Sequence, residues 1–141
     1  MALKECNLIL VLTMAGRYQR FIDEGYKTPK YLLPWGDRTI LSKIIQELNK
    51  DRCFDSIYLV ANKRDEIYMP HVRRINKALK IPNENLILIS DTVGQVHTAH
   101  EGIKRISKLI NDDSTPVAFH NIDTILLNRN FKNLASKLEN Y

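Results

Sequence analysis

The sequence is poor in cysteine and has no long apolar run. Cys6 and Cys53 are its only two cysteines, and they stand outside any Cys-x-x-Cys spacing. Two isolated thiols argue against a disulfide framework and for a reducing compartment. No run approaches the roughly 20 apolar residues of a membrane span, and Leu8–Leu12 is too short for a secretory signal. We therefore expect a cytoplasmic protein that does not enter a membrane.

Glycine and proline are also scarce, at 5 residues each in a chain of 141. Their scarcity argues against a collagen-like or low-complexity chain, and 44% hydrophobic with 26% charged residues is an ordinary globular composition. A chain of this length is about one domain and can bury a core without covalent staples. We expect residues 1–141 to form a single domain.

Positive charge is in modest excess, but it does not gather in one place. Lys and Arg number 21 against 16 Asp and Glu, a net charge of +5 that favours anionic partners in general. The cations are scattered rather than arranged as a basic stripe with interleaved aromatics, so nucleic-acid binding is not favoured. The densest groups, Lys63-Arg64 and Arg73-Arg74, are typical of the solvated surface of a helix.

Short runs rich in Leu, Ile and Val recur along the chain and predict strands. They are almost continuously apolar rather than alternating, which is typical of strands buried on both faces of a parallel sheet. The runs are Leu8–Thr13, Ser56–Ala61, Asn85–Ser90 and Pro116–Ile122.

Amphipathic segments lie between these runs and predict helices over Thr39–Lys50, Val72–Leu79 and Val96–Ile110. Alternation of strand and helix predicts a three-layer, Rossmann-like α/β domain with a mostly parallel sheet and right-handed crossovers. Ligands in such sheets bind beyond the carboxyl ends of the strands.

One irregular segment, Met14–Gly36, is too long to be a simple connection in a compact domain. Its prolines supply rigidity, which favours a functional loop, and we expect Trp35 to pack under it. Near its start stands Ala15-Gly16, which alone is more typical of a plain turn than of an anion site. Arg17, Arg20 and Lys30 follow in the same segment, and together with Gly16 they predict a polyphosphate cradle.

These residues, taken in order, resemble the amino-terminal signature of the sugar-phosphate nucleotidyltransferase family. The matching motifs are Leu12-Thr-Met-Ala-Gly16, Arg20-Phe21, Gly25-Tyr26, Pro29-Lys30 and Leu32-Leu33-Pro34. Gly-Tyr ahead of Pro-Lys resembles the subgroup of capsule and surface-polysaccharide loci. The resemblance implies a nucleotide-diphospho-sugar transferase-like fold and an enzyme that transfers NMP from an NTP to a sugar phosphate, or a related phosphate ester, with release of pyrophosphate.

The resemblance also implies a role for each matching residue. Met14, Ala15, Gly16 and Arg17 would contact the nucleotide. In the leaving pyrophosphate the β,γ-phosphates would be braced by Arg20, and charge at the α-phosphorus would be neutralised by Lys30. The partners implied are an NTP and a phosphorylated small-molecule acceptor, and the sequence leaves homo-oligomer formation open.

Two later segments agree with the resemblance. In Thr92–Gln95 the family's pattern implies that Gly94 and Gln95 approach the nucleobase, although these residues alone read as a helix cap. Asp123 follows the fourth strand, where the family places a carboxylate that binds a divalent cation. Mg²⁺ suits such a site, because it takes few carboxylates and completes its shell with phosphates and water. Without the resemblance, Asp123 is equally typical of a residue that caps the next helix.

Two departures from the family keep other functions open. The family's second glycine is replaced by Tyr18, and after Asp123 only Asn128–Tyr141, an expected terminal helix, stands where the family has a substantial segment with a second metal-binding carboxylate. The domain is therefore expected to be truncated relative to the family's. A non-catalytic nucleotide-binding module is the second interpretation. A nucleotide-sugar glycosyltransferase is the third interpretation, but near the fourth strand this sequence lacks the Asp-x-Asp motif that the class would need.

Overall fold

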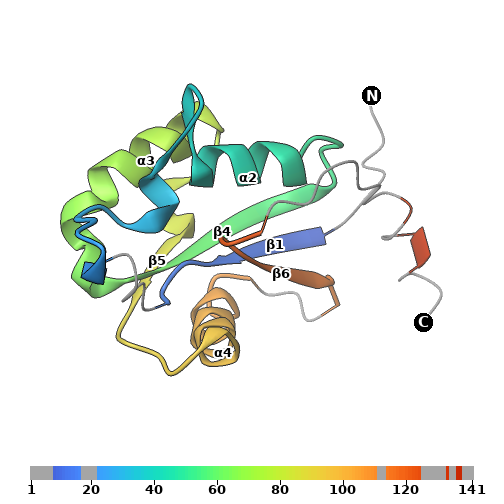
Figure 1. The fold of residues 1–141 in the computed structure, drawn as a ribbon. Helices are drawn as coiled ribbons and strands as arrows, with labels where there is room; N and C mark the ends of the chain where they lie inside the picture. Colours follow the sequence, from blue (N-terminus) through green and yellow to red (C-terminus); the bar gives the residue numbers. More distant parts are fainter. Residues whose placement is uncertain (1–7, 17–21, 111–113, 125–132, 134–135, 138–141) are drawn as a thin grey trace.

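The computed structural model describes residues 8–16, 22–110, 114–124, 133 and 136–137. Its centre is a parallel sheet of four strands in the order β5-β4-β1-β6 (Figure 1). These strands span Leu8–Thr13 (β1), Phe54–Asn62 (β4), Leu86–Ile89 (β5) and Val117–Asn121 (β6). All four lie on the predicted apolar runs, so the prediction of a parallel sheet is confirmed.

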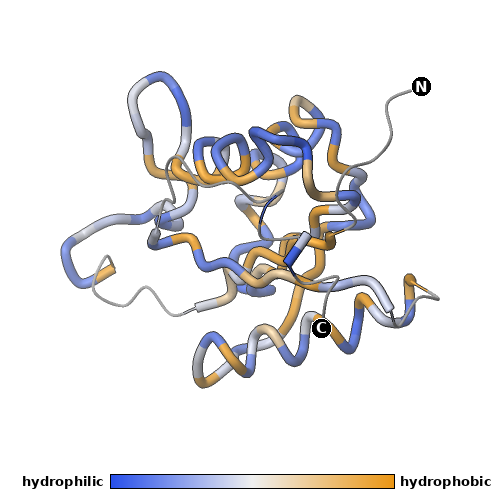
Figure 2. Tube along the Cα trace, turned by 90° about the vertical axis from the view of Figure 1, so that its right-hand side faces the viewer, coloured by the Kyte–Doolittle hydropathy of each residue, from blue (hydrophilic) through white to orange (hydrophobic). Residues whose placement is uncertain are grey.

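The strands are apolar because the sheet is covered on both faces. Helices α2 (Ile40–Leu48) and α3 (Met69–Ala78) lie on one face, and α4 (Gln95–Ile106) lies on the other (Figure 1). In β1 every residue is buried. Coloured by hydropathy, the chain is apolar along the sheet and along the sides of the helices that face it (Figure 2). The predicted three-layer α/β architecture is therefore confirmed.

Local sequence fixes where two of the helices begin. Thr39 caps α2, since its side-chain Oγ1 accepts a hydrogen bond from the Ser42 amide at 3.2 Å. Pro70 stands in the first turn of α3, where a missing N–H costs no helical hydrogen bond. Among the helices that the structure describes, none is long and apolar enough to cross a membrane.

The expected irregular segment Met14–Gly36 contains more structure than the sequence indicated. A 3-10 helix, η1 (Lys30–Leu32), is followed by a two-residue strand, β2 (Pro34–Trp35), which pairs with β3 (Arg38–Thr39). The expectation that Trp35 packs under the loop was wrong. Trp35 is 49% exposed, because it lies at the tip of this hairpin rather than under the loop.

The strand order determines where a ligand can bind. From β1 the chain moves to β4 and then β5 on one side, whereas β6 pairs with the opposite edge of β1. The helix that follows the β2–β3 hairpin, α2, and the helix before β6, α4, lie on opposite faces of the sheet (Figure 1). The carboxyl ends of β1 and β6 therefore form a topological switch point, where open α/β sheets leave a crevice.

Candidate functional site

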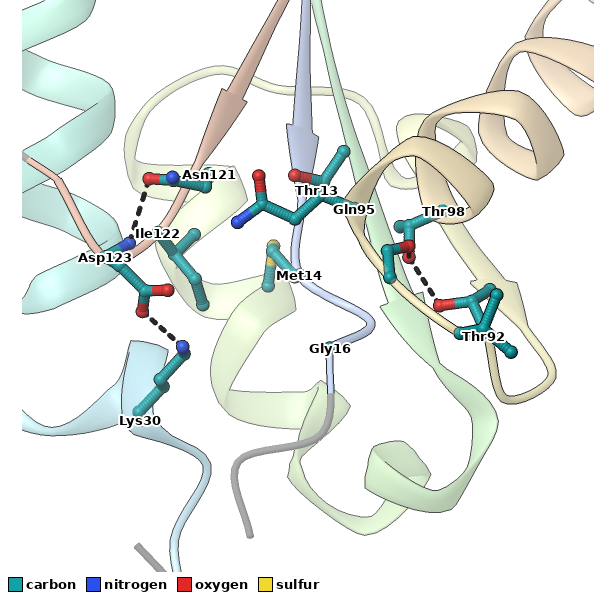
Figure 3. A pocket seen from close by; sticks show the side chains of 12 residues that line it. Thr13, Met14, Gly16, Lys30, Thr92, Gln95, Thr98, Asn121, Ile122 and Asp123 are labelled. Carbon is teal, nitrogen blue, oxygen red and sulfur yellow. Dashed lines mark hydrogen bonds and ion pairs between the residues drawn. The ribbon is translucent and has the colours of Figure 1, made fainter. Parts of the chain in front are cut away.

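A cavity of about 440 Å³ opens at this switch point, between the ends of β1 and β6 and the beginning of α4. It brings together six of the predicted site residues from four separate segments: Met14, Gly16, Lys30, Gly94, Gln95 and Asp123. Figure 3 shows all of them except Gly94, which it does not label, around one hollow. Whether they bind a nucleotide stays a prediction, but the fold does place them side by side.

One wall of the cavity carries its charged side chains. The Lys30 ammonium forms an ion pair with the Asp123 carboxylate, and the two point toward one another in Figure 3. The Asp123 amide donates to Oδ1 of Asn121 at 3.2 Å, which fixes the turn after β6. The lysine side chain is only 20% exposed and the aspartate side chain 51%. A cation and a carboxylate thus share this wall, and Asp123 keeps an accessible oxygen edge.

The floor is the end of β1 and the turn after it. Met14 is 2% exposed, and its amide donates to the Val60 carbonyl at 2.8 Å, which continues the sheet past the end of the strand. Gly16 follows, and a Cβ built there would meet nothing within 4 Å. Packing against the described residues therefore does not require a glycine at this position.

Ala15, predicted as a nucleotide contact, does not line the cavity. Its residue is 1% exposed and packs in the core beneath α4, because successive residues at the strand end point to opposite faces. Any contact from Ala15 to a ligand would have to use its backbone. Arg17, Arg20 and Tyr18 lie outside the described residues, so the structure does not place them.

The opposite wall is the amino terminus of α4. Gly94 is the N-cap of this helix, with no side-chain cap hydrogen bond, so amides of the first turn lack a capping side chain. Thr98 Oγ1 donates to the Gly94 carbonyl at 3.1 Å, and the Thr92 and Thr98 hydroxyls are 2.6 Å apart. In Figure 3 the Gln95 amide points from α4 toward the strand ends. A helix amino terminus at a cavity favours an anion.

The side chains of the cavity could bind a divalent cation only if phosphate oxygens and waters supply most of its ligands. Within the described part of the chain, no three or more His, Cys, Asp and Glu side chains cluster as a metal site. Asp123 is the carboxylate that lines the cavity. One carboxylate suits Mg²⁺, which usually retains waters and takes phosphate oxygens as further ligands. It does not suit a tightly caged structural metal.

One contact of Arg64 beside the cavity was not predicted from the sequence. Arg64 was expected on the solvated surface of a helix, but its Nη2 donates to the Gly16 carbonyl at 2.7 Å. Arg64 is exposed in the short 3-10 helix η2 (Lys63–Tyr68) directly after β4, so the expected helical surface position is confirmed, and only its contact to Gly16, at the same sheet edge as the cavity, was not predicted. The available signal was its position after a buried strand.

Comparisons with known proteins concern the fold. No protein-family model matches the sequence, and no curated protein matches it significantly. Among solved structures, a nucleoside-diphosphate-sugar pyrophosphorylase from Vibrio cholerae is similar with a TM-score of 0.74 at 23% identity, over 91% of this chain and 52% of that one. A 4-diphosphocytidyl-2C-methyl-D-erythritol synthase from Anaerococcus prevotii gives a TM-score of 0.51 at 18% identity, over 84% and 44%. The chain thus spans about half the length of these structures, and the predicted Rossmann-like fold is confirmed.

Proposed function

We propose that this chain binds an NTP in the switch-point cavity and transfers its NMP group to a phosphorylated small molecule, releasing pyrophosphate. The observation that carries the proposal is the meeting of the Lys30–Asp123 pair and the amino terminus of α4 across one cavity. Both walls favour phosphate, the first through a cation and the second through free amides. The similar folds include a nucleoside-diphosphate-sugar pyrophosphorylase, which supports the class of reaction.

The proposed reaction needs no nucleophilic side chain. A phosphate oxygen of the acceptor attacks the α-phosphorus of the NTP, a new P–O bond forms, and the bond to the β-phosphate oxygen breaks. Catalysis then consists of alignment and of neutralising the charge that moves onto the leaving pyrophosphate. Lys30 faces the cavity and supplies one cation for this purpose. Arg17 and Arg20 are proposed to contribute from the sequence pattern.

Mg²⁺ is the metal proposed for this reaction, and it would supply charge neutralisation at the phosphates. Asp123 would hold it, since this carboxylate lines the cavity with its side chain half exposed. In the structure the Lys30 ammonium forms an ion pair with the Asp123 carboxylate. The lysine and the metal ion would therefore either bind this carboxylate together or replace one another at it. The metal test is Asp123→Asn, which keeps the volume and removes the charge. Mg²⁺ dependence of NTP binding should largely disappear, whereas full dependence in this variant would remove Asp123 from the metal role.

The acceptor is proposed to be a sugar phosphate. Gly25-Tyr26 ahead of Pro29-Lys30 resembles the surface-polysaccharide subgroup, and the similar Vibrio cholerae structure is that of a nucleoside-diphosphate-sugar pyrophosphorylase. None of the described residues that line the cavity is assigned to the acceptor, so a related phosphate ester stays the second acceptor class. Gly94 and Gln95 are the proposed base contacts.

The deciding experiment is pyrophosphate release, measured for each NTP against a panel of sugar 1-phosphates with Mg²⁺. We expect release with one NTP and one acceptor class, and its loss in Lys30→Ala. The second candidate function, nucleotide binding without transfer, is favoured by the presence of one carboxylate, Asp123, among the described residues that line the cavity. Calorimetric NTP binding with no release from any pair would support that module instead.

A further inference from the structure

Arg64 joins three chain segments without lining the cavity. Its guanidinium donates from Nη2 to the Gly16 carbonyl at 2.7 Å, and it lies 3.6 Å from Asp91 Oδ1 and 3.8 Å from Asp65 Oδ1. Gly16 follows β1, Asp65 follows β4 and Asp91 follows β5. One side chain thus touches the segments that continue three neighbouring strands.

Asn62 completes the same contacts from the end of β4. It is 2% exposed, and its Nδ2 donates to Asp91 Oδ1 at 2.6 Å. Its Oδ1 accepts from the Arg64 amide at 2.9 Å, which fixes the start of η2. We call Asn62, Arg64, Asp65 and Asp91 the loop clamp. None of the four lines the cavity, but Gly16 and Thr92, which do, are bound to it or next to it in sequence.

The loop clamp also reaches the charged wall. Asp65 is 2% exposed, and its Oδ2 accepts from the Tyr31 hydroxyl at 3.1 Å. Tyr31 is fully buried and directly follows Lys30 in η1. Through Asp65 and Tyr31, the contact that holds Gly16 is therefore joined to the backbone that presents Lys30.

From this geometry we infer that Arg64 is a positioning residue, which holds the Gly16 turn and the segment before α4 at the separation that a polyphosphate needs. This inference rests on the proposed function. Two carboxylates lie against the guanidinium, so Arg64 contributes little net charge to the cavity, and its action is geometric. The planar guanidinium fork can serve several acceptors at once, which a lysine ammonium on a flexible stem does poorly.

The first test is calorimetry of the full chain with each of the four NTPs and MgCl₂. Arg64→Ala should weaken the best NTP by about tenfold or more, the usual effect of losing a charge-assisted hydrogen bond. Arg64→Lys should weaken it nearly as much. Lys63→Ala is the matched control, because it removes the same charge one residue away and makes none of these contacts. It should stay within about twofold of the wild type.

Asp91→Asn separates positioning from simple charge. Removing a carboxylate near a triphosphate should tighten binding if only net charge matters. The loop clamp predicts weaker binding, because Arg64 loses a partner. Full binding in Arg64→Lys with tighter binding in Asp91→Asn would make Arg64 a direct phosphate contact and overturn the inference.

A ligand-free measurement keeps this test separate from the proposed function. Hydrogen–deuterium exchange over residues 13–16 and 92–95 should be about tenfold faster in Arg64→Ala than in Lys63→Ala, at similar thermal midpoints, since local opening controls exchange there. If the wild type binds no NTP, the proposed function fails while this result still decides the positioning role. Unchanged exchange in Arg64→Ala overturns the loop clamp whether or not NTP binds.

Discussion

The body of the sheet and the loops at its carboxyl edge are held together in opposite ways. In the body, β1 and most of β4 are apolar and buried, and the contacts are packing between strands and helices. At the edge, the Gly16 turn and the segment before α4 are held by polar contacts between residues far apart in sequence. The first region gives the domain its stability, and the second positions the groups proposed to bind phosphate.

Two glycines, one in the body of the domain and one at the carboxyl edge of the sheet, differ in the same way. Gly102 in α4 is buried against β4, and an added Cβ would lie 2.7 Å from Val60 Cγ2. At Gly16 an added Cβ meets nothing. Gly102 is required by packing within the protein. Gly16 is not required by packing against the described residues, which leaves its Cα side open to a ligand.

The largest effect should come from the body. Leu59 in β4 is fully buried in the core beneath α2 and α3. Leu59→Ala should lower the free energy of unfolding by about 2 to 5 kcal/mol through lost burial and the cavity it leaves. Denaturant unfolding measures this, and Ile67→Ala, at a residue 77% exposed, is the control with little expected change. NTP affinity of the folded Leu59→Ala fraction should stay near wild type, and a parallel loss of affinity would mean that the regions are not separate.

Lys30→Ala should have the next largest effect, and it should fall on binding. A charge-assisted contact to phosphate contributes on the order of 1.5 to 3 kcal/mol, so NTP affinity should fall by about 10- to 150-fold. Stability should change little, because the Asp123 partner is half exposed. Lys43→Ala is the control, since Lys43 is also ion-paired, to Glu47 at 3.3 Å, but lies on α2 away from the cavity. Equal NTP losses in both variants would contradict a local role for Lys30.

The same contrast explains what the sequence could predict. Runs such as Leu8–Thr13 predict strands because burial on both faces leaves a local apolar pattern, and all four runs are strands in the structure. Lys30 and Asp123 were chosen by motif, and the fold does join them. The position of Arg64 after a buried strand could be read from the sequence, but its contact to Gly16 could not, because it spans 48 positions and depends on how two strand ends align. Trp35 was misjudged because hairpin pairing left it exposed.

A matched glycine pair tests the division more finely. Gly102→Ala should lower stability by about 1 to 3 kcal/mol, because a rigid, buried Val60 must move and the gain in helix propensity offsets only part of this cost. In a Val60→Ala background, which is itself less stable, the cost of Gly102→Ala should be smaller because the added methyl has room, a coupling that a double-mutant cycle measures. Gly16→Ala should leave the thermal midpoint unchanged and weaken NTP binding. If Gly16→Ala binds NTP as the wild type does, the turn does not approach the phosphates closely.

The smallest effect concerns pH and an exposed cluster on α4. The Lys104 ammonium, which donates to Glu101 Oε1 at 3.0 Å, is the main cause that lowers the pKa of Glu101 below its ordinary 4.5, with His97 and His100 adding to it. A carboxyl whose folded-state pKa is lowered stabilises the fold above its unfolded pKa, and this contribution is lost as pH falls through the folded pKa. The thermal midpoint of Glu101→Gln should therefore lie slightly below that of the wild type at pH 6 and converge with it toward pH 3.

His97 connects the segment before α4 to the exposed cluster, since its Nδ1 accepts from the Val93 amide at 3.2 Å and its Nε2 is 4.0 Å from Glu101. NTP affinity should be unchanged in Glu101→Gln, because Val93 keeps its bond to His97. A loss of NTP affinity would show that the polar contacts at the carboxyl edge of the sheet extend along α4 to Glu101. A difference in thermal midpoint that stays constant across the pH range would show that the ion pairs are not its cause.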